Sequence, residues 1–101
     1  MEEKMTINKT QEGTSVTLGI EGRLDTITAP ELEKEIQAVG DASALVIDCS
    51  KMEYISSAGL RVLLSAHKAF AKKDGMVVKN VSDTVLDIFD VTGFRDILNI
   101  Q

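Results

Sequence analysis

The segment of residues 45–64 changes from the pattern of a strand to that of a helix within a few residues. The apolar run Leu45–Ile47 has the length of a short buried strand, and a polar stretch, residues 48–54, follows it. After Ser56 and Ser57 come a glycine and then leucines that recur at helical spacing. This order predicts a strand, a polar turn and a helix, and it places both serines at the start of that helix.

The segments before this one predict an antiparallel hairpin and a first helix. The hairpin turn is expected at Gln11–Thr14, and residues 22–25 are expected to lead out of its second strand. Thr28 and Glu31 have the spacing of a capping box, and Pro30 falls in the first turn, where its missing N–H costs little. The apolar residues expected in the core of these elements are Met5, Ile7, Val16, Leu18, Ile20, Leu32, Ile36 and Val39.

The segments after it continue as helix, strand and helix. The helix after the serines is expected to run from about Ala58 to Lys72, and Met76–Val78 is expected to form the next buried strand. Ser82 and Gly93 are the expected ends of a third helix, and residues 97–100 are either an edge strand or a packed terminus. The predicted apolar side of the middle helix consists of Leu60, Leu63, Leu64, His67, Phe70 and Ala71.

Together these elements predict a single α/β domain over residues 1–101. An N-terminal antiparallel hairpin followed by βαβα forms a mixed β-sheet with helices packed mainly on one face. Leu45–Ile47 lacks alternation, which is typical of a parallel strand covered on both faces. Cys49 is expected to fill the core, and His67 is expected to be a buried or half-buried structural residue.

Composition and charge exclude several classes of function. The formal net charge of −5 argues against binding to nucleic acid, which needs clustered Lys and Arg. A single cysteine excludes an internal disulfide and a cysteine-pair zinc site. No apolar run approaches the roughly 18 to 20 residues that span a bilayer, and Met1–Lys4 does not begin a signal peptide. We therefore expect a cytoplasmic protein with no bound metal and no contact with a membrane.

Ser57 is the main candidate for chemistry. A serine at a strand-to-helix turn lies where backbone N–H groups and the positive end of the helix favour a negative charge. This position favours a phosphate, either as a ligand or as a covalent modification of Ser57. The simpler interpretation is that one of the two serines only caps the helix. Gly59 is expected to let a phosphate or a partner backbone approach closely.

A hydrolase is the weaker interpretation of the same turn. A nucleophile elbow has glycine two residues before the serine, where this chain has Ile55. The single histidine, His67, is ten residues along the same helix, roughly 15 Å from Ser57 at 1.5 Å per residue. It cannot act as a base for that serine, so no catalytic residue is predicted.

Two further groups of polar residues are candidate parts of the site. Asp25 and Thr28 lie between a strand and a helix, at the end of the sheet where the serines are expected. They either order that turn or bond a serine hydroxyl, or they serve only as a turn residue and a helix cap. Arg61, Ser65, Lys68 and Lys72 recur at helical spacing as a basic stripe, which is either a solvated face or part of a docking surface.

Three motifs in order carry a resemblance to a known family. They are Gly22–Asp25 with Thr28–Ala29, then Tyr54–Leu64, then Asp90–Phe94. With them the chain resembles, over essentially its whole length, the STAS domain family and in particular the small bacterial anti-sigma factor antagonists. The resemblance implies a STAS-like fold of the kind described above.

The resemblance also implies a partner-switching function. The unphosphorylated antagonist binds an anti-sigma factor that is also a serine kinase of the histidine-kinase-like ATPase fold. The kinase uses Mg-ATP to phosphorylate the serine and is released, and a PPM-type serine phosphatase resets the antagonist. The chain itself is then expected to be monomeric and to need no cofactor, since Mg-ATP or Mg-ADP is carried by the kinase.

Carried onto this sequence, the family pattern makes Ser57 the phosphate acceptor. Many members have aspartate where this chain has Ser56, and Ser56 is the second candidate for the phosphate acceptor. The implied partner-binding residues are Asp25, Thr26, Thr28, Ser56, Ser57, Ala58, Gly59, Arg61, Ser65 and Lys68. The alternative is a STAS module that does not switch, such as a scaffold or a nucleotide-sensing domain, with Ser57 only as a cap.

Overall fold

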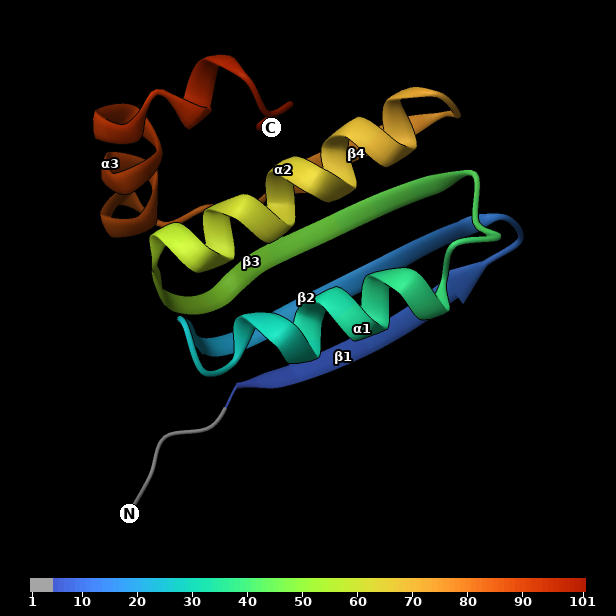
Figure 1. Cartoon of the computed structure of the whole chain (residues 1–101), viewed down its shortest axis with the longest axis horizontal. Helices are drawn as coiled ribbons and strands as arrows, with labels where there is room; N and C mark the ends of the chain where they lie inside the picture. The colour runs from blue at the N-terminus through green and yellow to red at the C-terminus, as the bar shows by residue number, and fades with distance from the viewer. Residues whose placement is uncertain (1–4) are drawn as a thin grey trace.

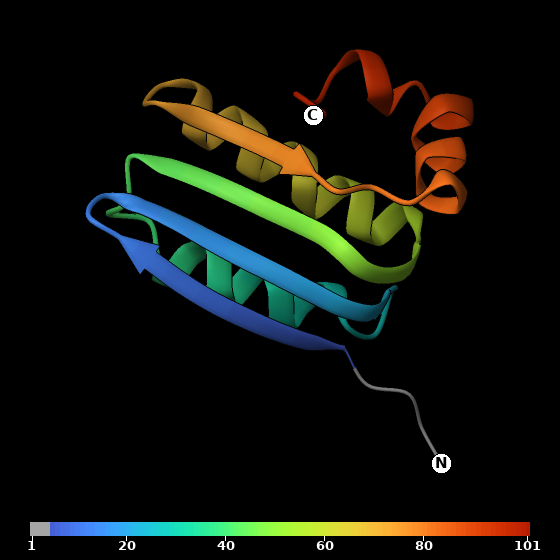
Figure 2. The same ribbon diagram turned by 180° about the vertical axis from the view of Figure 1, so that it is seen from behind.

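The computed structural model describes residues 5–101, which form a four-stranded mixed sheet with the order β1-β2-β3-β4. Strands β1 (Thr6–Glu12) and β2 (Ser15–Leu24) pair antiparallel, whereas β3 (Ala44–Ile55) and β4 (Gly75–Lys79) add in parallel. Helices α1 (Ala29–Ala38) and α2 (Ser57–Ala71) lie over one face of the sheet (Figure 1). Seen from behind, the other face is uncovered by helices (Figure 2). The predicted fold class is confirmed.

The two central strands are longer than the sequence pattern predicted. Strand β2 continues through residues 22–24, and β3 continues through the polar stretch of residues 48–54 that was expected to be a turn. Irregularities in the β2–β3 register at Gly19/Glu21 and Gly22/Arg23 explain the difference. They shift the alternation of buried and exposed residues along the strands, so the sequence does not show a regular period of two over their full length. With these shifts, Leu24, Met52 and Ile55 still point into the core, where each is at most 3% exposed.

The expectation that residues 45–47 are covered on both faces is wrong. Leu45 and Ile47 are buried, but Val46 between them is partly exposed, and Val77 is likewise partly exposed in β4. The physical reason is that the helices cover only one face, so each strand buries alternate residues. Cys49 is fully buried in β3, which confirms its predicted place in the core.

Helix α2 differs slightly from its predicted pattern. Leu60, Leu63 and Phe70 are buried as expected, but Ala66 is also buried and Ala71 is exposed. Besides Gly59, the buried residues are those at i, i+3, i+6 and i+10 from Leu60, on the side that faces the sheet. Leu64 and His67 are partly buried at the edge of this side.

The C-terminal region packs at the β4 side of the sheet. Helix α3 (Asp83–Thr92) begins at its predicted cap, where the Ser82 hydroxyl accepts a hydrogen bond from the Val85 N–H at 3.3 Å. It ends at Gly93, whose φ of 80° lies in the left-handed region. A 3-10 turn, η1 (Phe94–Asp96), was not predicted. The tail is a packed terminus and not an edge strand, since Leu98 is buried and Ile100 forms only an isolated parallel bridge with Val78. No helix within residues 5–101 is long and apolar enough to cross a membrane.

Candidate functional site

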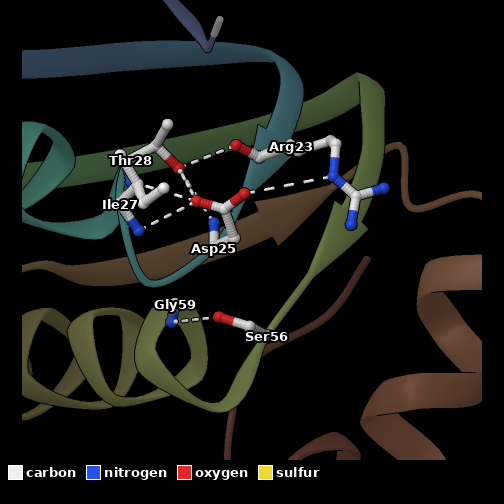
Figure 3. A network of polar contacts seen from close by, with 6 residues as sticks. All are labelled: Arg23, Asp25, Ile27, Thr28, Ser56 and Gly59. Atoms are coloured by element: carbon white, nitrogen blue, oxygen red, sulfur yellow. Dashed lines mark hydrogen bonds and ion pairs between the residues drawn. The ribbon is translucent and has the colours of Figure 1, made fainter. Parts of the chain in front are cut away.

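The candidate site lies at the edge of the sheet where β2 and β3 end. Because these strands are parallel neighbours, with Leu24 opposite Ile55, the segments that follow them emerge side by side. The Ser56 N–H donates a hydrogen bond to the Leu24 carbonyl at 2.9 Å. Figure 3 shows the two segments together, the loop of residues 25–28 above the first turn of α2. The predicted proximity of these two loops is confirmed.

Ser56 and Ser57 have different roles in the structure. Ser56 is extended, and its hydroxyl accepts a hydrogen bond from the Gly59 N–H at 3.4 Å, so Ser56 is the N-cap of α2. Ser57 is the first residue of the helix and is exposed. In the described part of the chain, no hydrogen bond engages the Ser57 hydroxyl. The interpretation of Ser57 as only a cap is therefore wrong, because its neighbour already has that role.

Gly59 does not offer the close approach that was expected of it. It is part of the first turn of α2 and is buried against the last residues of β2 and β3. A Cβ at this position would lie 2.7 Å from Leu24 Cγ and 2.9 Å from Ile55 Cγ1. The glycine is needed because the helix packs closely on the sheet here, and it presents no surface to a phosphate or a partner.

The loop of residues 25–28 is ordered by its own side chains. The Thr28 hydroxyl accepts a hydrogen bond from the Asp25 N–H at 2.8 Å and donates one to the Arg23 carbonyl at 2.7 Å. The Asp25 carboxylate accepts from the N–H groups of Ile27, at 3.0 Å, and Thr28, at 3.1 Å (Figure 3). Asp25 thus orders the turn, as predicted, and no hydrogen bond within residues 5–101 joins it to a serine hydroxyl.

The predicted capping box at Thr28 is wrong. Thr28 has helical backbone angles and its side chain makes no capping hydrogen bond to α1. The hydroxyl is turned back to Arg23 and Asp25 instead, and Thr28 is only 8% exposed. The hydroxyl bonds within the turn instead of capping the helix, because in the turn one hydroxyl satisfies two backbone groups at once. Pro30 does occupy the first turn of α1, as predicted.

The electrostatics of the loop keep Asp25 ionised. The hydrogen bond from the Thr28 N–H has the largest effect and lowers the pKa of the Asp25 carboxyl group. Desolvation, the second-largest effect, opposes it, and the Ile27 N–H, the Thr28 hydroxyl and the charge of Arg23 lower the pKa further. The Arg23 Nε lies 4.0 Å from the Asp25 carboxylate, and the guanidinium stacks 4.4 Å from the centre of the Tyr54 ring. A fixed negative charge therefore accompanies the loop beside Ser57.

Ile27 is a candidate that the sequence analysis missed. Its side chain is 84% exposed, although the Asp25 carboxylate holds its backbone in place. Single exposed apolar residues are common, but this one is fixed in the loop beside Ser57, where Thr26 is also exposed. An isoleucine inside an otherwise polar turn, outside any helical stripe, is the signal in the sequence that marks it.

The basic stripe is on the exposed side of α2. Arg61, Ser65, Lys68 and Lys72 all face away from the sheet, while Ala58 in the first turn is partly buried. The stripe begins one turn after Ser57, so it is continuous with the start of the helix.

The family model of the STAS domain matches residues 6–101 of this sequence. The chain belongs to the STAS domain family. Two similar STAS relatives are each named as an anti-sigma-B factor antagonist. The one from Bacillus subtilis is 29% identical over 93 residues, covering 90% of this chain and 85% of the relative. The one from Listeria monocytogenes is 28% identical over 96 residues, covering 92% and 84%.

A solved structure has a similar fold. The crystal structure of an anti-sigma factor antagonist from Mycobacterium paratuberculosis superposes on this STAS domain with a TM-score of 0.86 at 27% identity. The match covers 96% of this chain and 85% of the other.

Proposed function

We propose that this STAS protein is an anti-sigma factor antagonist whose binding to an anti-sigma factor is controlled by phosphorylation of Ser57. The observation that carries the proposal is the division of roles at the start of α2. Ser56 caps the helix, and the Ser57 hydroxyl is exposed and not engaged by any hydrogen bond within residues 5–101. The names of the relatives support the same function.

Phosphorylation at Ser57 changes the surface more than the fold. A phosphate adds roughly −1.5 to −2 charges, and the N-terminus of a helix accommodates such a charge well. A partner packed on Ile27 and the start of α2 would instead have to bury this charge in an interface that also contains the loop of the ionised Asp25. A thousand-fold loss of affinity requires only about 4 kcal/mol.

The exposed members of the predicted site form the proposed contact together with Ile27. These members are Thr26, Ser57, Arg61, Ser65 and Lys68. Thr28 and Gly59 are buried, so they support the contact from below. Ser56 is the less favoured phosphate acceptor, since its oxygen is engaged by the Gly59 N–H and its loss would leave the helix uncapped.

The enzymes of the cycle are part of the proposal and follow from the family resemblance. The anti-sigma factor is a serine kinase of the histidine-kinase-like ATPase fold that carries Mg-ATP. The γ-phosphoryl group of ATP moves to the Ser57 oxygen, the hydroxyl proton is released and ADP is left. A PPM-type serine phosphatase then uses water to regenerate Ser57 and inorganic phosphate.

The test is a capture experiment with three baits: wild type, Ser57→Ala and Ser57→Asp. The baits are exposed to a lysate of the source cells with Mg-ADP, and the affinity of the recovered ATPase is then measured with purified components. We expect wild type and Ser57→Ala to bind alike and Ser57→Asp to bind at least about a hundredfold more weakly. Equal binding by all three baits would mean that the protein is an adaptor that does not switch.

A further inference from the structure

A second apolar residue is as exposed as Ile27, and it lies on a different element. Val91, in the last turn of α3, is 84% exposed, the same fraction as Ile27. Val85 and Phe89 are fully buried and fix α3 on the core. The capping bond of Ser82 and the left-handed Gly93 fix its two ends. Val91 is therefore presented to solvent by a firmly held helix.

The sheet order places this helix beside the Ser57 turn. Strand β3 lies between β2 and β4, and all three are parallel, so the chain leaves them in the same direction. Strand β4 ends opposite Asp48, and residues 80–82 lead from there to α3. Figures 1 and 2 both show α3 at the end of the sheet where α2 begins. Ile27 and Val91 thus belong to the elements on either side of Ser57.

The charges around these residues are of opposite sign on the two helices. Helix α2 exposes Arg61 and Lys68, and Lys72 is exposed at its C-cap. Helix α3 exposes Asp83, Asp87 and Asp90 at helical spacing, and of these Asp90 pairs with Arg95 at 3.0 Å. A partner that covers both helices must present acidic groups to α2 and basic groups to α3.

We propose, on the basis of the proposed function, that α3 is a second contact for the same anti-sigma factor. Val91 inserts into an apolar depression of that partner, and basic side chains beside the depression face Asp83 and Asp87. The opposite charges of α2 and α3 set the orientation of the partner. Ser57 then lies between two apolar anchors, where a phosphate is hardest to hydrate.

The size of the molecule is consistent with this contact. A standard interface buries about 800 Å² on each partner. The domain measures 35 × 32 × 19 Å along its principal axes. An interface of ordinary size at this end of the sheet therefore extends well beyond the first turn of α2, and α3 is the element next to it.

The experiment measures the affinity and association rate of the purified anti-sigma factor for a set of variants. Val91→Ala removes apolar area without weakening the helix, and we expect about tenfold weaker binding, as for Ile27→Ala. Asp87→Lys should slow association about threefold or more, with a smaller effect at high salt. Asp74→Lys is the matched control, because Asp74 is exposed just before β4, at the opposite end of the sheet, and its variant should bind as wild type.

Ser57→Asp in the same titration separates this inference from the proposed function. If Ser57→Asp abolishes binding while Val91→Ala and Asp87→Lys bind as wild type, the α3 contact is wrong and the switch stands. If Val91→Ala weakens binding but Ser57→Asp does not, the α3 contact stands and the switch is wrong. Thermal unfolding of each variant checks that a loss of binding is not a loss of fold.

Discussion

The Ser56 N–H and the Leu24 carbonyl are joined by a hydrogen bond of 2.9 Å, and this bond continues the pairing of β2 and β3 one residue beyond β3. It ties the start of α2 to the end of β2, from which the loop of residues 25–28 departs. The loop that carries Asp25 and Ile27 therefore has a fixed position beside Ser57. The site is rigid where the strands end, and its function depends on the groups exposed there.

The two serines should respond differently to substitution. Ser56→Ala removes the N-cap of α2 and should lower the free energy of unfolding by about 1 kcal/mol. Ser57→Ala should change it by less than about 0.5 kcal/mol, because the Ser57 side chain is exposed. Urea unfolding measures both effects. A larger loss for Ser57→Ala than for Ser56→Ala would contradict the assignment of the cap.

Gly59→Ala should destabilise the protein although alanine favours helices. Its Cβ would approach Leu24 and Ile55 to within 3 Å, and relief of this overlap should cost about 1–3 kcal/mol. Gly19→Ala is the control, since a Cβ there would meet only ordinary contacts at 3.7 Å or more. Urea unfolding compares the two variants. Equal stability would show that α2 can move away from the sheet at little cost.

Thr28→Val tests the ordering of the loop beside Ser57. The substitution leaves the Arg23 carbonyl and the Asp25 N–H without their partner, which should cost about 1–3 kcal/mol of stability. Thr28→Ser keeps the hydroxyl and should lose less. Partner affinity should fall with Thr28→Val, because the hydroxyl holds Asp25, whose carboxylate in turn holds the Ile27 backbone. Unchanged stability and affinity would contradict a structural role for this hydroxyl.

Asp25 should make stability depend on pH in the acid range. Its pKa in the folded protein is below the ordinary value of 3.8, so its contribution is fully present above that pH. The contribution is lost as the pH falls through the lower folded value. Asp25→Asn should therefore flatten the decrease in melting temperature between pH 5 and pH 2, measured by circular dichroism. Asp41→Asn, at an exposed residue in the turn after α1, should leave the decrease unchanged.

Asp48 should contribute in the same direction as Asp25. Its pKa is lowered first by the Ser50 N–H, with further help from the Asn80 side chain and against desolvation. Asp48→Asn should therefore also flatten the acid decrease. Only Asp25→Asn is expected to change partner affinity, since Asp48 is in the middle of β3.

Cys49 should be unreactive in the folded protein. Burial raises the pKa of its thiol to about 12, so almost no thiolate exists at neutral pH, and the side chain is fully buried. A colorimetric thiol reagent should label it only after unfolding in denaturant. Rapid labelling of the native protein would show that β3 opens at low cost.

The sequence predicted the fold well because each helix carries a local signal. The capping Ser82 and Gly93 mark the two ends of α3, and apolar residues at helical spacing mark α1 and α2. These signals involve residues close in the chain, so they survive without tertiary context. The strand limits failed, because the shifts at Gly19 and Gly22 are defined only by pairing with β3.

For the site, the sequence alone determined the serine pair, its place before α2, and the polar loop at Asp25 and Thr28. Only the tertiary structure decided which serine caps the helix, what Gly59 packs against and where the Thr28 hydroxyl points. Each of these depends on the pairing of β2 with β3. The role of a hydroxyl or a glycine is set by the groups around it, and here long-range strand pairing brings those groups into place.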